Sequence, residues 1–238
     1  MRNGYYDDMG LNTPVAEALP ADRATFIRKT YMHLAGAVAV FAAVETLLFA
    51  SGIATSMMQA LAGTGKIMMI GILVLAMAGS WVSQTMAASQ NRGTQYAGLA
   101  LYTGLKVVMF MPILYIAAVK CPGVIAKAGV ITGLLVAALT AVVFTTRKDF
   151  SFMGTGLMIF GFIAMGVVIC GLIFGFQLGV WFSALMIMFA AGMILYSTSN
   201  ILHNYSTENY VGASLELFSS VMLLFYYILR LFMGSRDE

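Results

Sequence analysis

The sequence predicts an all-α integral membrane protein with seven transmembrane helices. Hydrophobic residues make up 61% of its 238 residues and charged residues only 10%, which is too little polar surface to cover a soluble domain of this size. Seven apolar stretches reach the length of about 20 residues that a helix needs to cross the hydrocarbon core. The 24 glycines favour helices packed through small residues over the alternating strands of a barrel.

The seven spans follow one another closely, so residues 27–238 are predicted to form one membrane domain. We expect the spans at 27–52, 66–88, 95–119, 125–146, 153–175, 179–202 and 211–233. The longest connection, the apolar IATSMMQALAGTG after the first span, is expected to lie in the membrane interface. The five residues GFQLG (175–179) predict a tight helical hairpin between the fifth and sixth spans.

The first 26 residues differ in character from the rest and are predicted to be a soluble, mobile tail. They carry four acids and two prolines instead of the basic start and apolar core of a signal peptide. Positive residues then indicate the orientation, because Arg28 and Lys29 beside the first span favour a cytoplasmic N-terminus. An odd number of spans places the C-terminus outside.

Three ionisable residues are expected at membrane depth: Glu45, Lys106 and Glu216. Each would cost roughly 2.5–3.5 kcal/mol at the bilayer centre, so it must face protein or water. Glu45 falls near the outer end of its span, where it can also reach interfacial water. Lys106 falls near mid-membrane and can reach either carboxylate. Our hypothesis is an ion pair between Lys106 and Glu216, which can be purely structural or mark function.

Uncharged polar residues gather in the last two spans. Residues 150–207 contain no Asp, Glu, Lys or Arg, yet MILYSTSN (193–200) brings three hydroxyls and an amide to the inner end of the sixth span. On the last span Glu216 and Ser220 share one helical face, and Ser220 is expected at the depth of Ser197. The alternative for these serines is a hydrogen bond to a helix carbonyl that permits close packing.

No constellation of catalytic or metal-ligating residues is visible in the sequence. It has no His-Glu-x-x-His motif, Gly-Ala-Ser at 212–214 is not the Gly-x-Ser-Gly of rhomboid proteases, and His33 and His203 have no neighbouring acid to orient them. We therefore expect neither enzymatic activity nor a cofactor or metal. A net charge of +3 spread over both sides of a membrane gives no support for nucleic-acid binding.

A charged cluster follows the fourth span at the expected inner face. Asp149 adjoins Arg147 and Lys148. Asp149 can cap the start of the next helix or pair locally, and the alternative is that the three residues dock a partner.

Several segments of the chain resemble the Bax inhibitor-1 family of membrane proteins. The resemblance is carried by FTTRKDFSFMGTGLMIF (144–160), ILYSTSNILH (194–203) and ASLELFSSVMLLFYYILRLF (213–232). The first two are similar to segments typical of the bacterial branch associated with the FtsH-type membrane protease. The resemblance implies a bacterial inner-membrane protein in which six helices surround a central C-terminal helix.

Family members that act as pH-sensitive calcium leaks carry one Asp in the sixth span and one in the seventh. The corresponding positions here are Ser197 and Ser220. Two serines cannot share a proton as close carboxylates do. The resemblance therefore implies that pH gating is altered or absent.

The sequence and the resemblance favour two functions. The first is a modulator or binding partner of an FtsH-type membrane protease, with the N-terminal tail offered to the proteolytic chamber. The alternative is a calcium or other cation leak whose path includes Ser197, Ser220, Glu216 and Lys106.

Overall fold

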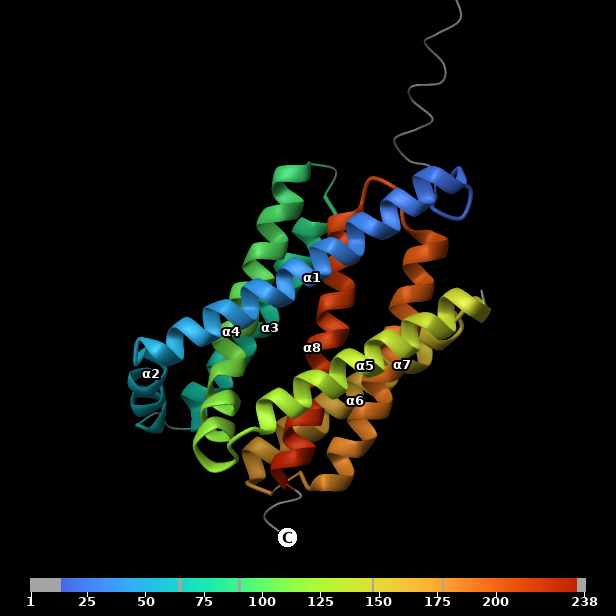
Figure 1. Cartoon of the computed structure of the whole chain (residues 1–238). Helices are drawn as coiled ribbons and strands as arrows, with labels where there is room; N and C mark the ends of the chain where they lie inside the picture. Colours follow the sequence, from blue (N-terminus) through green and yellow to red (C-terminus); the bar gives the residue numbers. More distant parts are fainter. Residues whose placement is uncertain (1–13, 64–65, 90, 147, 177, 235–238) are drawn as a thin grey trace, which may run out of the picture.

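The computed structural model describes residues 14–63, 66–89, 91–146, 148–176 and 178–234, without the side chains of 66–70 and 73. These residues form eight helices and no named strand. The helices are α1 (Pro20–Ala50), α2 (Ile53–Ala62), α3 (Lys66–Ala87), α4 (Arg92–Lys120), α5 (Val124–Thr146), α6 (Met153–Phe174), α7 (Val180–Asn204) and α8 (Tyr210–Gly234). The all-helical class is thereby confirmed (Figure 1).

Six of the helices, α1 and α4 to α8, are long and apolar enough to cross a membrane. The second predicted span coincides with α3, some of whose side chains lie outside the described part of the chain. The count of seven spans therefore stays a prediction. The short α2 occupies the connection that was expected in the membrane interface.

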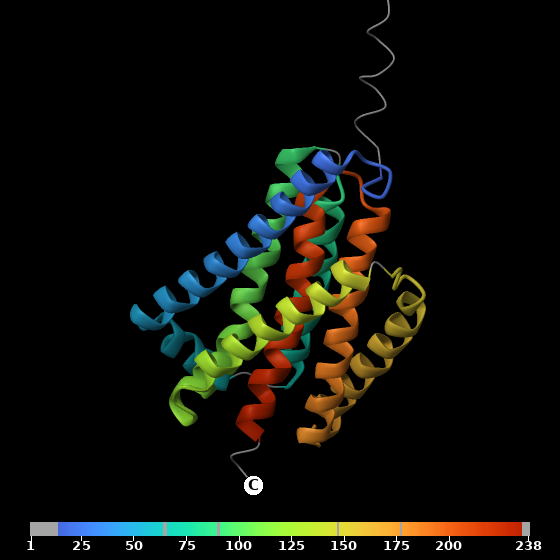
Figure 2. The ribbon, with the colours of Figure 1, turned by 45° about the vertical axis from the view of Figure 1, so that its right-hand side comes forward.

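Helix α8 is the most buried of the candidate spans. It contacts α1, α3, α4, α5 and α7, and half of its most apolar window is buried, a larger share than in any of the other five candidate spans. Figure 2 shows α1 and α5 crossing α8 obliquely, while α4 and α7 lie alongside it. The core is consequently built around side chains of α8, with Phe218, Leu224 and Leu229 fully buried.

Local sequence accounts for where several helices begin and end. Pro20 opens α1, where its missing N–H costs nothing. The side chain of Asn91 accepts a hydrogen bond from the N–H of Gly93 at 2.8 Å and caps α4. Gly175 adopts a positive φ of 77° and ends α6, which only glycine does without strain. The α6–α7 hairpin predicted at GFQLG follows from this turn.

The segment before α1 is anchored on the loop between α7 and α8. The N–H of Val15 donates to the carbonyl of Tyr205 at 2.8 Å, and the side chain of Val15 is fully buried. Helix α1 begins at Pro20, seven residues before the predicted start of the first span. Residues 20–26 of the predicted tail are therefore helical, and the predicted mobility of residues 1–13 lies outside the described residues.

Candidate functional site

A polar cluster lies between α7 and α8 and contains three of the four residues predicted for an ion path, Ser197, Ser220 and Glu216. The hydroxyl of Tyr205 donates to Oε2 of Glu216 at 2.5 Å, and the amide nitrogen of Asn200 lies 3.4 Å from both carboxylate oxygens. Asn204 in turn donates to the Asn200 side-chain carbonyl at 2.9 Å. The Glu216 carboxylate is therefore held by neutral hydrogen-bond donors.

Ser197 and Ser220, which the resemblance aligns with the acid pair of calcium-leak proteins, meet in the same region. Their Oγ atoms are 3.3 Å apart, and both side chains are buried, Ser197 completely. The Ser220 hydroxyl is also 3.3 Å from the backbone carbonyl of Glu216, one turn earlier on α8. The Ser220 hydroxyl thus contacts Ser197 across the helix interface and also bonds within its own helix.

Lys106 does not form the expected ion pair with Glu216. Its Nζ lies 4.9 Å from the ring centroid of Tyr102, a cation–π arrangement, and the Tyr102 hydroxyl donates to Oγ of Ser219 at 2.6 Å. Helix α8 turns Ser219 toward α4 but Glu216 toward α7, so the lysine and the carboxylate have different partners. The hypothesis of a Lys106–Glu216 pair is wrong for this structure.

Glu45 is buried rather than exposed to interfacial water. Its side chain is 5% exposed, and neither carboxylate oxygen has a hydrogen-bond partner among the described residues. It lines a large apolar cavity between α1 and α5. The alternative that placed this carboxylate in interfacial water therefore does not describe its surroundings.

Asp149 organises the loop between α5 and α6. Its Oδ1 accepts the N–H of Ser151 at 2.8 Å and lies 3.4 Å from the Ser199 hydroxyl, which itself accepts the N–H of Phe150 at 2.9 Å. Asp149 therefore orders the turn before α6 but does not cap the helix, because the N-cap residue is Phe152 and no side chain accepts a capping hydrogen bond there. Lys148 and Asp149 are exposed, and Arg147 lies outside the described residues.

We expect the contribution of Asp149 to depend on pH. The hydroxyl and then the backbone N–H of Ser151 hold the pKa of the Asp149 carboxyl below its usual range. A lowered folded-state pKa means that the stabilisation is present above the unfolded value of about 3.9 and is lost as the pH falls through the folded value. Asp149→Asn should therefore lower the melting temperature at neutral pH but not in strong acid. An equal difference at both pH values would assign the effect to packing.

A second prediction concerns the hydrogen bond that holds Glu216. Tyr205→Phe should lower the free energy of unfolding by about 1–3 kcal/mol, because it leaves a buried carboxylate oxygen without its shortest hydrogen bond. Tyr115→Phe on α4, whose hydroxyl has no hydrogen bond recorded in the described structure, is the matched control. Denaturant unfolding in detergent measures both variants, and equal stabilities would contradict the assigned bond.

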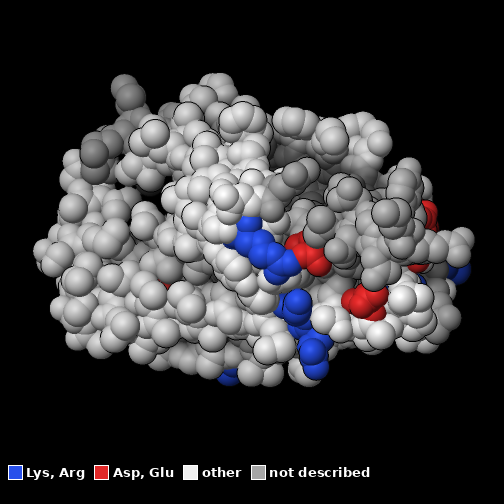
Figure 3. Space-filling view, turned by 90° about the horizontal axis from the view of Figure 1, so that it is seen from above, with Lys and Arg blue, Asp and Glu red and all other residues white. Residues whose placement is uncertain are grey.

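One cluster was not foreseen from the sequence. Arg92 forms an ion pair with Glu208 and donates to the Tyr210 hydroxyl at 2.7 Å, while Nε2 of His33 lies 2.9 Å from the hydroxyl of Tyr96. Figure 3 looks onto this end of the bundle, where basic and acidic side chains gather on an otherwise uncharged surface. Arg92 and Glu208 are 116 residues apart, so no local pattern could pair them.

Among the described residues, no group of three or more His, Cys, Asp or Glu side chains could hold a metal ion. In comparisons with known proteins, the family described as "Inhibitor of apoptosis-promoting Bax1" matches residues 23–237. No curated protein and no solved structure matches the chain.

Proposed function

This chain belongs to the Bax inhibitor-1 family, and from that premise we propose that it binds and modulates an FtsH-type membrane protease. In this proposal it is a seven-span protein of the bacterial inner membrane, with α8 as the central helix, a cytoplasmic N-terminus and an external C-terminus. The contacts and burial of α8 support the central position. The Arg and Lys distribution supports the orientation.

The observation that carries the proposal is the contact between the two segments that resemble the protease-associated branch. The loop at 148–151 and the sixth-span motif at 194–203 are joined by the bonds of Ser199 to Phe150 and Asp149. Together they form one unit at the end of α5 and α7, with the charged side chains of Lys148 and Asp149 exposed. Such a unit offers a partner a charged docking point beside the membrane.

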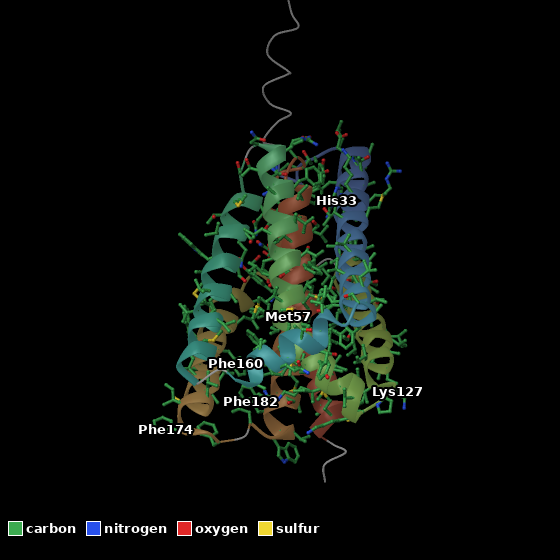
Figure 4. All side chains as sticks on the ribbon, turned by 90° about the vertical axis from the view of Figure 1, so that its left-hand side faces the viewer. His33, Met57, Lys127, Phe160, Phe174 and Phe182 are labelled. Atoms are coloured by element: carbon green, nitrogen blue, oxygen red, sulfur yellow. The ribbon has the colours of Figure 1, made fainter. Side chains whose placement is uncertain are left out.

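Affinity purification from native membranes tests this function. We expect the wild-type chain to retain the FtsH-type protease, and Lys148→Glu to retain much less of it, because the charge at the docking unit is reversed. Lys127→Glu is the matched control, because Lys127 is also exposed but lies near the start of α5, whereas Lys148 follows the end of that helix. Figure 4 shows Lys127 at the opposite end of the bundle from His33. Absence of the protease from the wild-type sample would remove this function.

The N-terminal tail adds a second test of the same proposal. A processive protease needs an accessible end. Val15 is anchored on the α7–α8 loop, so we propose that the protease captures the N-terminal segment that precedes Val15. Deleting residues 2–13 should lengthen the half-life of the protein in cells. An unchanged half-life would argue against capture from the N-terminus, without affecting the docking test.

A cation leak is the second candidate, and the Glu216 cluster favours it. A carboxylate with Tyr205 and Asn200 beside it, one turn from the Ser197–Ser220 contact, supplies oxygen atoms inside the bundle where a calcium ion could bind. Liposomes that contain the protein and a calcium dye test the leak, and Glu216→Gln should abolish any flux. No flux from about pH 5 to about pH 8, the range in which such switches titrate, would remove this candidate.

A further inference from the structure

A long apolar groove runs between α1 and α5, with α8 as its floor. It has a volume of about 1130 Å³, which is above the roughly 300–1,000 Å³ of small-molecule pockets. Along α1 its lining extends from Tyr31 to Phe49. At about 1.5 Å per residue this is about 27 Å, close to the roughly 30 Å thickness of the hydrocarbon core. An occupant that fills it must be elongated and apolar. Figure 1 shows that α1 and α5 each pass in front of α8.

The walls of the groove carry small residues at helical spacing. On α5 these are Gly129, Gly133, Ala137 and Ala141, four residues apart, and on α1 they are Ala35, Ala39 and Ala42. A Cβ atom added to Gly129 or Gly133 would meet no other atom within 4 Å. These glycines therefore do not serve close packing against the described part of the chain. Small residues every fourth position are what the close approach of another membrane helix requires.

Glu45 is an independent sign that the groove is incomplete without a ligand. It is the only charged residue among the described side chains that line the groove, it is 5% exposed, and both of its oxygens lack a partner. Buried polar groups are normally satisfied, so donors from outside the chain are expected here.

We propose that the groove between α1 and α5 binds a membrane-spanning helix of a partner protein that carries a Lys or Arg at the level of Glu45. The charge of Glu45 calls for a basic donor, and the glycine spacing on α5 calls for a helix backbone. A lipid acyl chain could fill an apolar space, but it would need neither glycines at every fourth position nor a carboxylate. The inference goes beyond the proposed function, because it concerns the membrane-embedded side of the bundle and not the docking unit at its end.

Site-specific photocrosslinking of the full chain in native membranes tests the proposal. A photoreactive benzoylphenylalanine at Ala137 faces the groove, whereas the same residue at the exposed Ala138, which does not line it, is the matched control. We expect a polypeptide adduct at 137 and not at 138. Mass spectrometry should place the crosslink in a membrane-spanning peptide that contains Lys or Arg, and Glu45→Gln should reduce the yield at least several-fold.

Three results would overturn the proposal: an adduct of lipid mass at position 137, an adduct of two copies of this chain, or equal yields at positions 137 and 138. Gly133→Leu, which fills the groove, should also abolish the polypeptide adduct, and Ala138→Leu should leave it unchanged. If the crosslinked peptide comes from another membrane protein while the protease is absent from the affinity purification, the groove inference stands and the proposed function fails. The two failures are thus distinguishable.

Discussion

Gly98→Ala should destabilise the bundle by about 1–3 kcal/mol, and Gly98→Val by more, because the site has no room for a side chain. A Cβ at this position of α4 would lie 2.7 Å from the backbone carbonyl of Ser83 and 2.9 Å from the backbone nitrogen of Ala87, both on α3. Backbone atoms cannot rotate away as a flexible side chain can. The whole of α3 would have to move off α4.

The expected loss is large because α3 is held from two sides at the same turn. A Cβ at Gly212 of α8 would lie 2.7 Å from the carbonyl of Ala87. Displacing α3 from α4 therefore pushes it against α8, the most buried of the candidate spans. Because the core is closely packed, such a shift of α3 costs free energy of folding.

Gly104→Ala is the matched control for this prediction. It lies on the same helix, and a Cβ there would meet no atom within 4 Å. Alanine is favoured over glycine in a helix interior by roughly 0.5–1 kcal/mol, so this variant should be neutral or more stable. Thermal unfolding in detergent measures both variants. Equal melting temperatures for Gly98→Ala and Gly104→Ala would contradict the close approach of α3 to α4.

Introducing an acid pair at Ser197 and Ser220 should create a pH-dependent calcium leak. In the double variant Ser197→Asp and Ser220→Asp, two carboxylates would replace hydroxyls whose oxygens are 3.3 Å apart. Carboxylates this close share a proton, and when both are ionised they repel each other. They also supply oxygen ligands for calcium. We expect calcium flux into liposomes to rise with pH in the double variant, well above that of the wild-type chain.

The double variant Ser197→Asn and Ser220→Asn is the control, because it has nearly the same size without a charge. Flux in both double variants would assign the leak to loosened packing between α7 and α8. A silent Asp variant that still folds would show that the acid pair alone does not open this bundle, and would weaken the cation-leak candidate.

The helices were predictable because the membrane leaves the backbone little choice. In hydrocarbon every backbone N–H and C=O must be satisfied internally, so a long apolar stretch becomes a helix. The predicted spans at 125–146 and 153–175 therefore agree within a residue with α5 (Val124–Thr146) and α6 (Met153–Phe174). Helix α1 begins at Pro20, seven residues before the predicted span, because the acids and prolines before residue 27 resemble a tail, whereas proline is also favoured in the first turn of a helix.

The approximate location of the polar site was also predictable, but its pairing was not. Depth along each helix placed Ser197 and Ser220 at one level, and their hydroxyls lie in contact. Depth could not say which face of α8 meets which neighbour. Lys106 was therefore assigned to Glu216, although the structure gives it the ring of Tyr102. A long flexible side chain reaches several partners, and only the rotation of the helices selects among them.

The sequence by itself determined that this chain forms apolar helices that carry a few ionisable groups, because hydrophobicity and backbone hydrogen bonding act locally along the chain. Tertiary structure alone decided what those groups face. It gave Glu216 a shell of neutral donors and joined Arg92 to Glu208. It left Glu45 without a partner in a groove between two helices distant in sequence. These outcomes depend on how whole helices pack and cross, which no local pattern encodes.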